Sequence, residues 1–260
     1  MGDENEREEE FALPPAIAAA WGLRERPGKG PKRALSLERI VEAAVKVAAA
    51  DGLQALSMSR VAAELGASAM ALYRYVSSKE ELLTHMLDAV FGPPPPLPEP
   101  GDDWRTALTR WARALRRVMR RHPEFVRIPI SGPPLTPNSV RWMEAGLRCL
   151  RGSGLSADAK LSALLLLNGF VRSEVMLMAD LAAASAAAGG VDPAETSRVY
   201  GRTLAKLTDP RLFPELHEII RAGVFEDDDD PDYDFEFGLT RILDGLETLI
   251  RSSAEEDRSG

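Results

Sequence analysis

The sequence predicts an all-α protein that divides into two helical domains. Alanine and leucine are abundant and aromatic residues make up only 6% of the chain, a balance that favours helix over sheet. No stretch of strand length alternates Val, Ile or Thr with polar residues. The run "PPPPLPEP" at residues 93–100 forms a stiff linker between two stretches with helical periodicity. We therefore expect a small N-terminal domain and a larger C-terminal one.

Residues 1–33 are predicted to form a flexible arm that is first acidic and then basic. The opening "GDENEREEE" is a solvated acidic run, and "RERPGKGPKR" is rich in Pro, Gly and positive charge. The net charge of the whole chain is −8. From Arg24 to His85, however, 10 basic residues outnumber 7 acidic ones. The charge is thus polarised, with a basic segment attached to an acidic remainder.

The first and fourth helices of the N-terminal domain have clear start and stop signals. Ser36 is a suitable N-cap for the first helix, and Gly52 suits the left-handed position that follows many helices. Ser78 and Glu81 form a capping box, S-x-x-E, that opens a fourth amphipathic helix ending at Phe91. Both helices repeat apolar residues at intervals of three and four, as expected for helices that pack on a core.

The second and third helices form a predicted helix-turn-helix. Ser57 can cap a short helix over residues 58–65, and "GAS" at residues 66–68 makes a turn of the right length. Ser68 can cap the third helix, which is expected over residues 69–75. The exposed start of the helix after Ser57 can also bind a phosphate, because helix N-termini present free N–H groups.

Beyond the linker the helical pattern continues to the end of the chain. Glycine pairs, prolines and an acidic loop, "EDDDDPDYD", separate the periodic segments. The helices are predicted over residues 103–121, 138–151, 156–188, 193 onward, 214–222 and 232–252.

The sequence gives no sign of a secreted, membrane-spanning or catalytic protein. The N-terminus is acidic rather than leader-like, and the longest apolar stretch, around residues 164–171, is too short to cross a bilayer. Cys149 is the only cysteine, so no internal disulfide forms. Nucleotide-binding and hydrolase motifs are missing, and the three histidines lie far apart. We expect a cytoplasmic protein that is not an enzyme and uses no metal or cofactor.

Residues 36–90 carry an ordered set of short motifs. Within "ERIVEAAVKVAAADGLQALSMSRVAAELGASAMALYRYVSSKEELL", a first helix ends in D-G and is followed by S-x-x-x-V-A-x-x-L-G, A-L-Y-x-Y-V and S-K-x-x-L. This order resembles the N-terminal domain of the TetR (tetracycline repressor) family of bacterial transcription regulators. Residues 101–250 resemble that family's C-terminal domain in outline, notably in "RRHPEF" and "FEFGLTRILDGLETLI".

The resemblance implies a ligand-responsive transcription regulator, expected to be a repressor. It implies a DNA-binding domain at residues 34–91 that reads palindromic double-stranded operator DNA. Residues 92–260 would bind a small-molecule effector and form the homodimer, so that the effector alters the spacing of two DNA-reading domains. The alternative is a helical small-molecule-binding or adapter protein whose DNA-binding domain is idle, and a gel-shift assay separates the two.

The resemblance also assigns candidate DNA contacts. Small Ala69 would let the helix backbone approach the major groove, Met70 suits a thymine methyl, and Tyr73 can donate its hydroxyl to a phosphate. Arg74 reads a guanine or lies on the backbone. The positions of the family motif are Ser68, Ala69, Met70, Tyr73, Tyr75 and Lys79.

Positive charge for DNA is expected mainly from the arm. Basic arms follow the phosphate backbone or enter a narrow minor groove. Two open alternatives are that the arm only keeps the protein soluble and that Tyr73 and Tyr75 are half-buried packing residues. The basic residues of the arm are Arg24, Arg26, Lys29, Lys32 and Arg33.

The effector site is predicted from polar and aromatic residues of the C-terminal domain. Asn168 and Arg172 lie one turn apart in an apolar helix, with Glu174 close by, and either line a pocket, form a structural network or contact a second subunit. Aromatic and Met residues either form an apolar pocket wall or belong to the plain core. They are Trp111, Met119, Phe125, Trp142, Met143 and Met176.

Two helices are longer and more apolar than one subunit needs. In the resembled fold the matching helices, here residues 156–188 and 232–252, form a four-helix dimer interface. An apolar stripe on the second of them is predicted to be the seam, with intrachain core as the alternative. The stripe consists of Leu239, Ile242, Leu243, Leu246 and Ile250.

Overall fold

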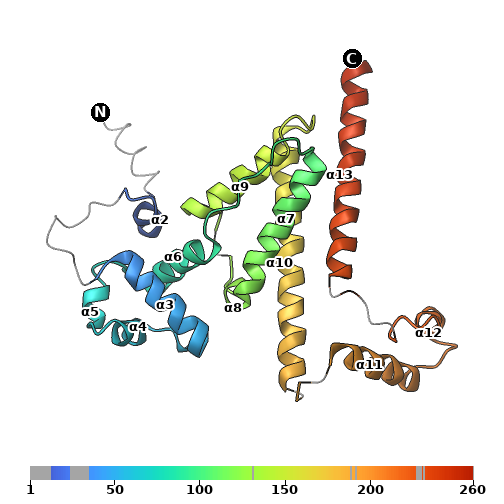
Figure 1. The fold of residues 1–260 in the computed structure, drawn as a ribbon, viewed down its shortest axis with the longest axis horizontal. Coiled ribbons are helices and arrows are strands. Elements are labelled where there is room, and N and C mark those ends of the chain that lie inside the picture. The colour runs from blue at the N-terminus through green and yellow to red at the C-terminus, as the bar shows by residue number, and fades with distance from the viewer. Residues whose placement is uncertain are drawn as a thin grey trace.

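The computed structural model describes residues 13–23, 35–130, 132–187, 189–190, 192–226, 230 and 232–259. Helices are the only regular elements in these segments, which confirms the all-α prediction. Figure 1 shows a small group of helices at the N-terminal side and a larger group of longer helices beside it. We call residues 35–91 the head and residues 92–259 the body.

The head is built from α3 (Leu37–Asp51), α4 (Met58–Glu64), α5 (Ala69–Leu72) and α6 (Lys79–Phe91), with a 3₁₀ turn at Leu53–Ala55. Side-chain oxygens cap each α-helix as expected, because each accepts a hydrogen bond from the backbone three residues on. The capping residues are Ser36, Ser57, Ser68 and Ser78. One apolar core joins the four helices.

The body is built on α7 (Trp104–Arg121), α9 (Pro137–Cys149), α10 (Ala157–Ala187) and α13 (Tyr233–Ser259), with the short α8 (Pro123–Val126) at its junction with the head. The buried faces of the four long helices form a second core. α11 (Pro193–Leu207) and α12 (Pro214–Arg221) contact each other and project from the base of the body (Figure 1).

The described part of the arm differs from the predicted flexible tail. Pro15–Ala20 form a helix, α2, that packs on α6 of the head. Trp21 follows it and donates its indole N–H to the carbonyl of Leu135, 2.7 Å away. Pro14 and Pro15 favour a helix start here, but the six-residue length gives too little periodicity to predict the helix. The arm is therefore anchored beside the junction of head and body.

Three other expectations are corrected. The third helix of the head ends at Leu72, and Tyr73 to Tyr75 form a turn because the chain must bend toward α6. Phe125 belongs to the core of the head rather than to a wall of the body. α13 extends beyond residue 252 to Ser259.

The predicted seam on α13 faces inward instead of outward. Leu239, Leu243 and Leu246 are at most 7% exposed and pack in the core of the body, so the intrachain alternative holds for them. Ile242 and Ile250 are half-buried against the same core. The error is one of rotation, since a periodic stripe identifies a buried face without identifying its partner.

α10 matches the long apolar helix predicted over residues 156–188, but its whole length is more apolar than the 164–171 stretch on which a membrane span was excluded. Its 31 residues are sufficient, by length and composition alone, to cross a membrane. One side packs inside the body through Leu164, Leu167 and Val171, while Leu165 and Leu177 on the other side are exposed. Such a helix is also typical of a soluble protein that buries its second face against another chain.

Candidate functional site

The head presents the second helix of its helix-turn-helix to solvent. Ser68 Oγ accepts a hydrogen bond from the backbone N–H of Ala71 at 3.3 Å, which fixes the start of α5. Met70 is 74% exposed and Tyr73 47% exposed, whereas Leu72 is completely buried. Ala69 is half-buried against the core. α5 is therefore anchored in the core through Leu72, while the side chains of Met70 and, in the following turn, Tyr73 are exposed to solvent.

Charged residues flank this surface. Arg74 and Lys79 are exposed, the latter as the first residue of α6. Arg60 also lies in the helix-turn-helix, but its guanidinium donates hydrogen bonds to Asp51 and Glu64, which raise its pKa. Arg60 is thus engaged within the head, and Arg74 and Lys79 are better placed to meet phosphates.

Tyr75 has a different position from Tyr73. It is half-buried against the core of the head, and its hydroxyl donates a hydrogen bond to the carbonyl of Leu35 at 3.1 Å. Leu35 directly follows residues 24–34, which lie outside the described residues together with Arg24, Arg26, Lys29, Lys32 and Arg33. Tyr75 therefore holds the point at which the basic segment joins the head, and the packing alternative describes it better than a DNA contact.

In the body, the predicted aromatic wall is a tightly hydrogen-bonded pair. Trp111 and Trp142 are 3% and 4% exposed, and their rings meet edge to face with centroids 6.2 Å apart. The Trp111 indole donates to the Trp142 carbonyl, and the Trp142 indole donates to the carbonyl of Gly92, both at 3.0 Å. Met119 is buried in the same core, and Met143 and Met176 pack on its margin. These residues are core side chains that border on α10.

Arg172 on α10 has an unusual environment for a cation. Its guanidinium donates a hydrogen bond to the carbonyl of Ile128 at 2.7 Å, and burial lowers its pKa. No carboxylate forms an ion pair with it among the residues that the structure describes. Asn168 lies one turn away, half-buried, and its amide has no partner in the described part of the chain. Two half-buried polar side chains thus lie one turn apart on α10, and neither pairs with a carboxylate of the described residues.

Glu174 does not join this pair, because residues two apart on a helix point to different sides. It accepts hydrogen bonds from Arg116 on α7, at 2.6 and 3.0 Å. Arg116 also donates to Asp232 at 2.6 Å and lies over the ring of Phe235 at 4.1 Å. The sequence missed this network, since its members lie 58 and 116 residues apart.

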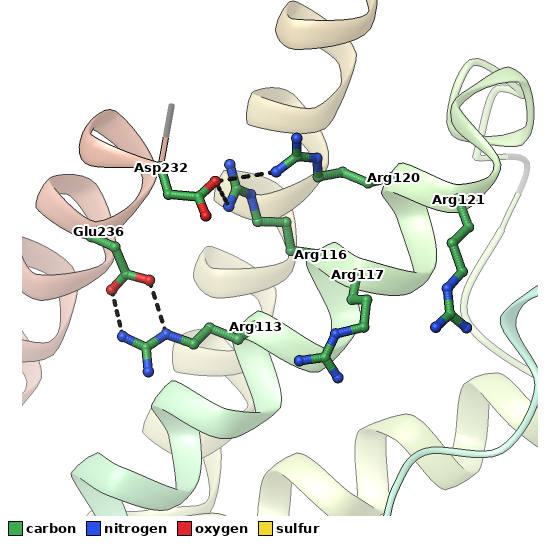
Figure 2. A pocket seen from close by; sticks show the side chains of 7 residues that line it. All are labelled: Arg113, Arg116, Arg117, Arg120, Arg121, Asp232 and Glu236. Atoms are coloured by element: carbon green, nitrogen blue, oxygen red, sulfur yellow. Dashed lines mark hydrogen bonds and ion pairs between the residues drawn. The ribbon is translucent and has the colours of Figure 1, made fainter. Parts of the chain in front are cut away.

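Figure 2 shows the arginine-rich hollow, of about 430 Å³, in which this network lies. Arg113 pairs with Glu236 through two bonds of 2.8 Å, and Arg116 and Arg120 share Asp232. The sticks of Arg117 and Arg121 point away from both carboxylates. The ion pairs join α7 to the start of α13, so they are first of all a structural link. The lining residues are Arg113, Arg116, Arg117, Arg120, Arg121, Asp232 and Glu236.

No group of three or more His, Cys, Asp or Glu side chains that could hold a metal is present in the described segments. Cys149 is buried, and burial raises the pKa of its thiol to about 11, so it is a thiol at neutral pH.

Two family models match the chain. Residues 40–86 match the model described as bacterial regulatory proteins of the tetR family, and residues 97–250 match the tetracyclin repressor-like C-terminal domain. Among curated proteins, the chain is 41% identical over 239 residues to the HTH-type transcriptional repressor DrrR1 of Streptomyces coeruleorubidus. That alignment covers 88% of this chain and 84% of the relative.

Solved structures show the same similarity in three dimensions. Apo ActR from Streptomyces coelicolor superposes with a TM-score of 0.70 at 30% identity, covering 87% of this chain and all of that one. ActR in complex with actinorhodin gives a TM-score of 0.69 at 32% identity, covering 83% and 98% of the two chains. Both the head and the body are thus shared with proteins of known type.

Proposed function

The chain belongs to the TetR family of ligand-responsive transcription regulators. We propose that it represses transcription by binding a palindromic operator as a homodimer. Binding of a small-molecule effector in the body then releases the protein from the operator. The relatives are transcription regulators rather than enzymes. A protein of this kind acts in the cytoplasm, where its operator DNA lies.

The proposed DNA surface comprises α5 and the residues around it. Met70 and Tyr73 carry the sequence-dependent contacts, because they are the exposed large apolar or aromatic side chains of α5 and the turn that follows it. Arg74, Lys79 and the N-terminus of α4 at Ser57 supply phosphate contacts, together with the basic segment of the arm. Tyr75 acts indirectly by holding Leu35.

The proposed effector is mostly apolar and carries one anionic or strongly hydrogen-bond-accepting group. The observation that supports this is Arg172, a half-buried cation that lacks a carboxylate partner among the described residues. Asn168 lies one turn away and offers a further hydrogen bond. Trp111, Met119, Trp142 and Met176 form the apolar surroundings.

Actinorhodin, the compound bound to the similar ActR, is the first probe of this effector chemistry. Arg172→Met should weaken its binding at least tenfold, measured by titration calorimetry. Arg127→Met is the matched control, because Arg127 has a carboxylate partner in Asp180 and should leave the affinity within twofold. Equal affinities of the Arg172 variant and the parent, or no binding by the parent, would contradict the proposed chemistry without touching the DNA-binding proposal.

The proposed dimer interface is the outer face of α10 and α13. Exposed apolar residues occur along both helices, most of them separated by four or twelve residues, and those on α13 lie beside the predicted seam. A four-helix arrangement of two such pairs would cover them. The exposed residues are Leu161, Leu165, Leu166, Leu177 and Leu181 on α10, and Tyr233, Phe237 and Leu249 on α13.

Sedimentation tests the interface directly. Leu165→Asp should give a monomer at micromolar concentration, because Leu165 is 74% exposed at the middle of the proposed face. Ile130→Asp is the control, since Ile130 is 69% exposed but lies in the loop after α8 and not on α10 or α13. Footprinting of the parent should then show an inverted repeat with half-sites about one helical turn or more apart. A monomeric parent, or protection of a single half-site, would contradict the dimer.

A further inference from the structure

The first turn of α9 is capped by a side chain of the head. Its N-cap residue, Thr136, makes no side-chain hydrogen bond to the backbone of the first turn. Instead the hydroxyl of Thr136 meets that of Ser139, 2.5 Å away. The helices α3 to α7 differ, because each is capped by the Ser or Asp that precedes it. The N–H groups at the start of α9 are therefore left open to another residue or to water.

Asp88 supplies that missing cap from α6. One carboxylate oxygen of Asp88 accepts the backbone N–H of Asn138 at 2.8 Å. The Asn138 amide returns two bonds, to the carbonyl of Asp88 at 2.9 Å and to its second carboxylate oxygen at 3.1 Å. A negative charge at a helix N-terminus is also favoured by the helix dipole. Residues 50 positions apart thus perform the task that a single local side chain performs elsewhere.

A second hydrogen bond fixes the same two helices one turn further on. The indole of Trp142 on α9 donates to the carbonyl of Gly92, the residue that ends α6. The bonds from Asn138 and Trp142 are four residues apart on α9, and their acceptors at Asp88 and Gly92 are four residues apart on α6. Two matched turns are therefore joined, which prevents the helices from sliding or rotating past each other.

The position of this junction gives it a function. α6 is the last helix of the head and leads into the body, whereas α9 carries Trp142 and packs against α10, on which Arg172 lies. A displacement of α9 must move α6 with it as long as the cap holds. Without the cap, α9 loses the satisfaction of its first turn and the two helices can separate.

We propose that Asp88 and Asn138 are positioning residues that make α6 and α9 move as one unit and thereby couple the operator-reading head to the effector domain. This inference rests on the proposed function, since it names the contact through which that regulation passes. Neither residue belongs to the proposed DNA surface or to the proposed effector site, so the coupling can be altered while both binding surfaces stay intact.

The first experiment is done on the free protein and needs no ligand. Amide hydrogen exchange is measured by mass spectrometry on the free parent, on Asp88→Ala and on Asp103→Ala. Asp103 is the matched control, because its carboxylate caps α7 by accepting the N–H of Thr106 at 2.7 Å and bridges no second helix. Asp88→Ala should accelerate exchange at least tenfold in residues 136–142 and also in the last turn of α6. Asp103→Ala should accelerate exchange only at the start of α7.

The second experiment measures whether DNA binding at the head changes hydrogen exchange in α9. Each protein is saturated with a duplex that the parent has itself selected from random-sequence DNA, and exchange is compared with the free state. In the parent and in Asp103→Ala, DNA bound at the head should slow exchange in residues 136–142 at least threefold. In Asp88→Ala and Asn138→Ala that response should be lost while protection of α5 remains. The double variant Asp88→Ala/Asn138→Ala should be no worse than either single one.

The outcomes separate the two hypotheses. Unchanged exchange of residues 136–142 in Asp88→Ala would overturn the cap, and an unchanged DNA response in that variant would overturn the coupling. If the parent protein selects no duplex, the proposed DNA binding is contradicted instead. The experiment on the free protein would still decide whether Asp88 caps α9.

Discussion

The head and the body are stabilised by contacts that span very different distances along the chain. In the head, Ser36, Ser57, Ser68 and Ser78 each cap a helix through the backbone three residues on. In the body, Arg116 joins residues 58 and 116 positions away. The N-terminus of α9 in the body is also capped by a residue of the head, Asp88. The fold of the head therefore depends mainly on contacts between neighbours in the sequence, whereas the body depends on contacts between distant segments.

The largest loss of stability is expected when the long-range ion pair of Arg116 is removed from the body. The side chains of Arg116 and Glu174 are 8% and 9% exposed, so removing the arginine leaves a buried carboxylate unpaired. Arg116→Ala should lower the free energy of unfolding of the body by about 3 kcal/mol, measured by urea denaturation followed through tryptophan fluorescence. Hydrogen exchange in α3 and α4 of the head should stay unchanged at low denaturant.

The double variant Arg116→Met/Glu174→Leu is the control for that experiment. It removes both charges and replaces them with apolar side chains of similar size, so most of the stability that the single variant loses should return. If the single variant costs less than ~1 kcal/mol, a long-range ion pair is not what holds α7 to α10.

The second prediction separates the arm from both domains. Replacing Arg24, Arg26, Lys29, Lys32 and Arg33 by Gln should weaken DNA binding at all sequences and leave actinorhodin binding unchanged. The log–log salt slope of DNA binding should fall by roughly 0.9 for each phosphate that the arm no longer neutralises. Substitution is preferable to truncation of residues 1–33, because truncation would also remove α2 from α6. A slope equal to that of the parent would mean that the arm only keeps the protein soluble.

A third prediction divides the head itself, using two tyrosines that are two residues apart. Tyr73→Phe should weaken operator binding by about 1 kcal/mol without loss of stability, as expected for one hydroxyl that meets a phosphate. Tyr75→Phe should instead lower the thermal stability of the head, because its hydroxyl bonds Leu35 within the protein. Fluorescence anisotropy and thermal melting measure the two quantities. Interchanged effects would show that the groove-facing side of this segment is assigned wrongly.

The smallest effect is expected at Met70. Its side chain is 74% exposed and carries no charge, so Met70→Ala should change total affinity little. It should alter which base is preferred where a thymine methyl meets the helix, since apolar contacts distinguish thymine from the other bases. Selection from random-sequence DNA with parent and variant compares these preferences. Identical selected motifs would place Met70 outside the groove.

The same contrast explains what could be predicted from the sequence. The caps, the helix-turn-helix and the two-domain division depend on neighbours within a few residues, and the structure confirms them. α2 escapes prediction because six residues carry too weak a period, and the turn after Leu72 continues a pattern that looks helical. The cap by Asp88 has no local signal at all, since an aspartate inside an amphipathic helix looks like an ordinary surface residue.

The sequence also does not predict which neighbouring element the apolar face of a helix packs against. The stripe at Leu239, Leu243 and Leu246 is recognisably apolar, but only the packed structure shows that it faces α7 and α10. Likewise, proximity in sequence groups Glu174 with Arg172, whereas the helix directs Glu174 to Arg116. The roles proposed for Arg172 and Asn168 remain a prediction.

If an effector bound in the body lowers the affinity of the head for its operator, a complete thermodynamic cycle of the two binding reactions will show it. Titration of one operator duplex with and without saturating actinorhodin gives one ratio of dissociation constants, and titration of actinorhodin with and without the duplex gives the other. We expect two equal ratios, each about 5- to 150-fold, because the coupling of two binding sites is reciprocal. Binding of both ligands with ratios near one would contradict it.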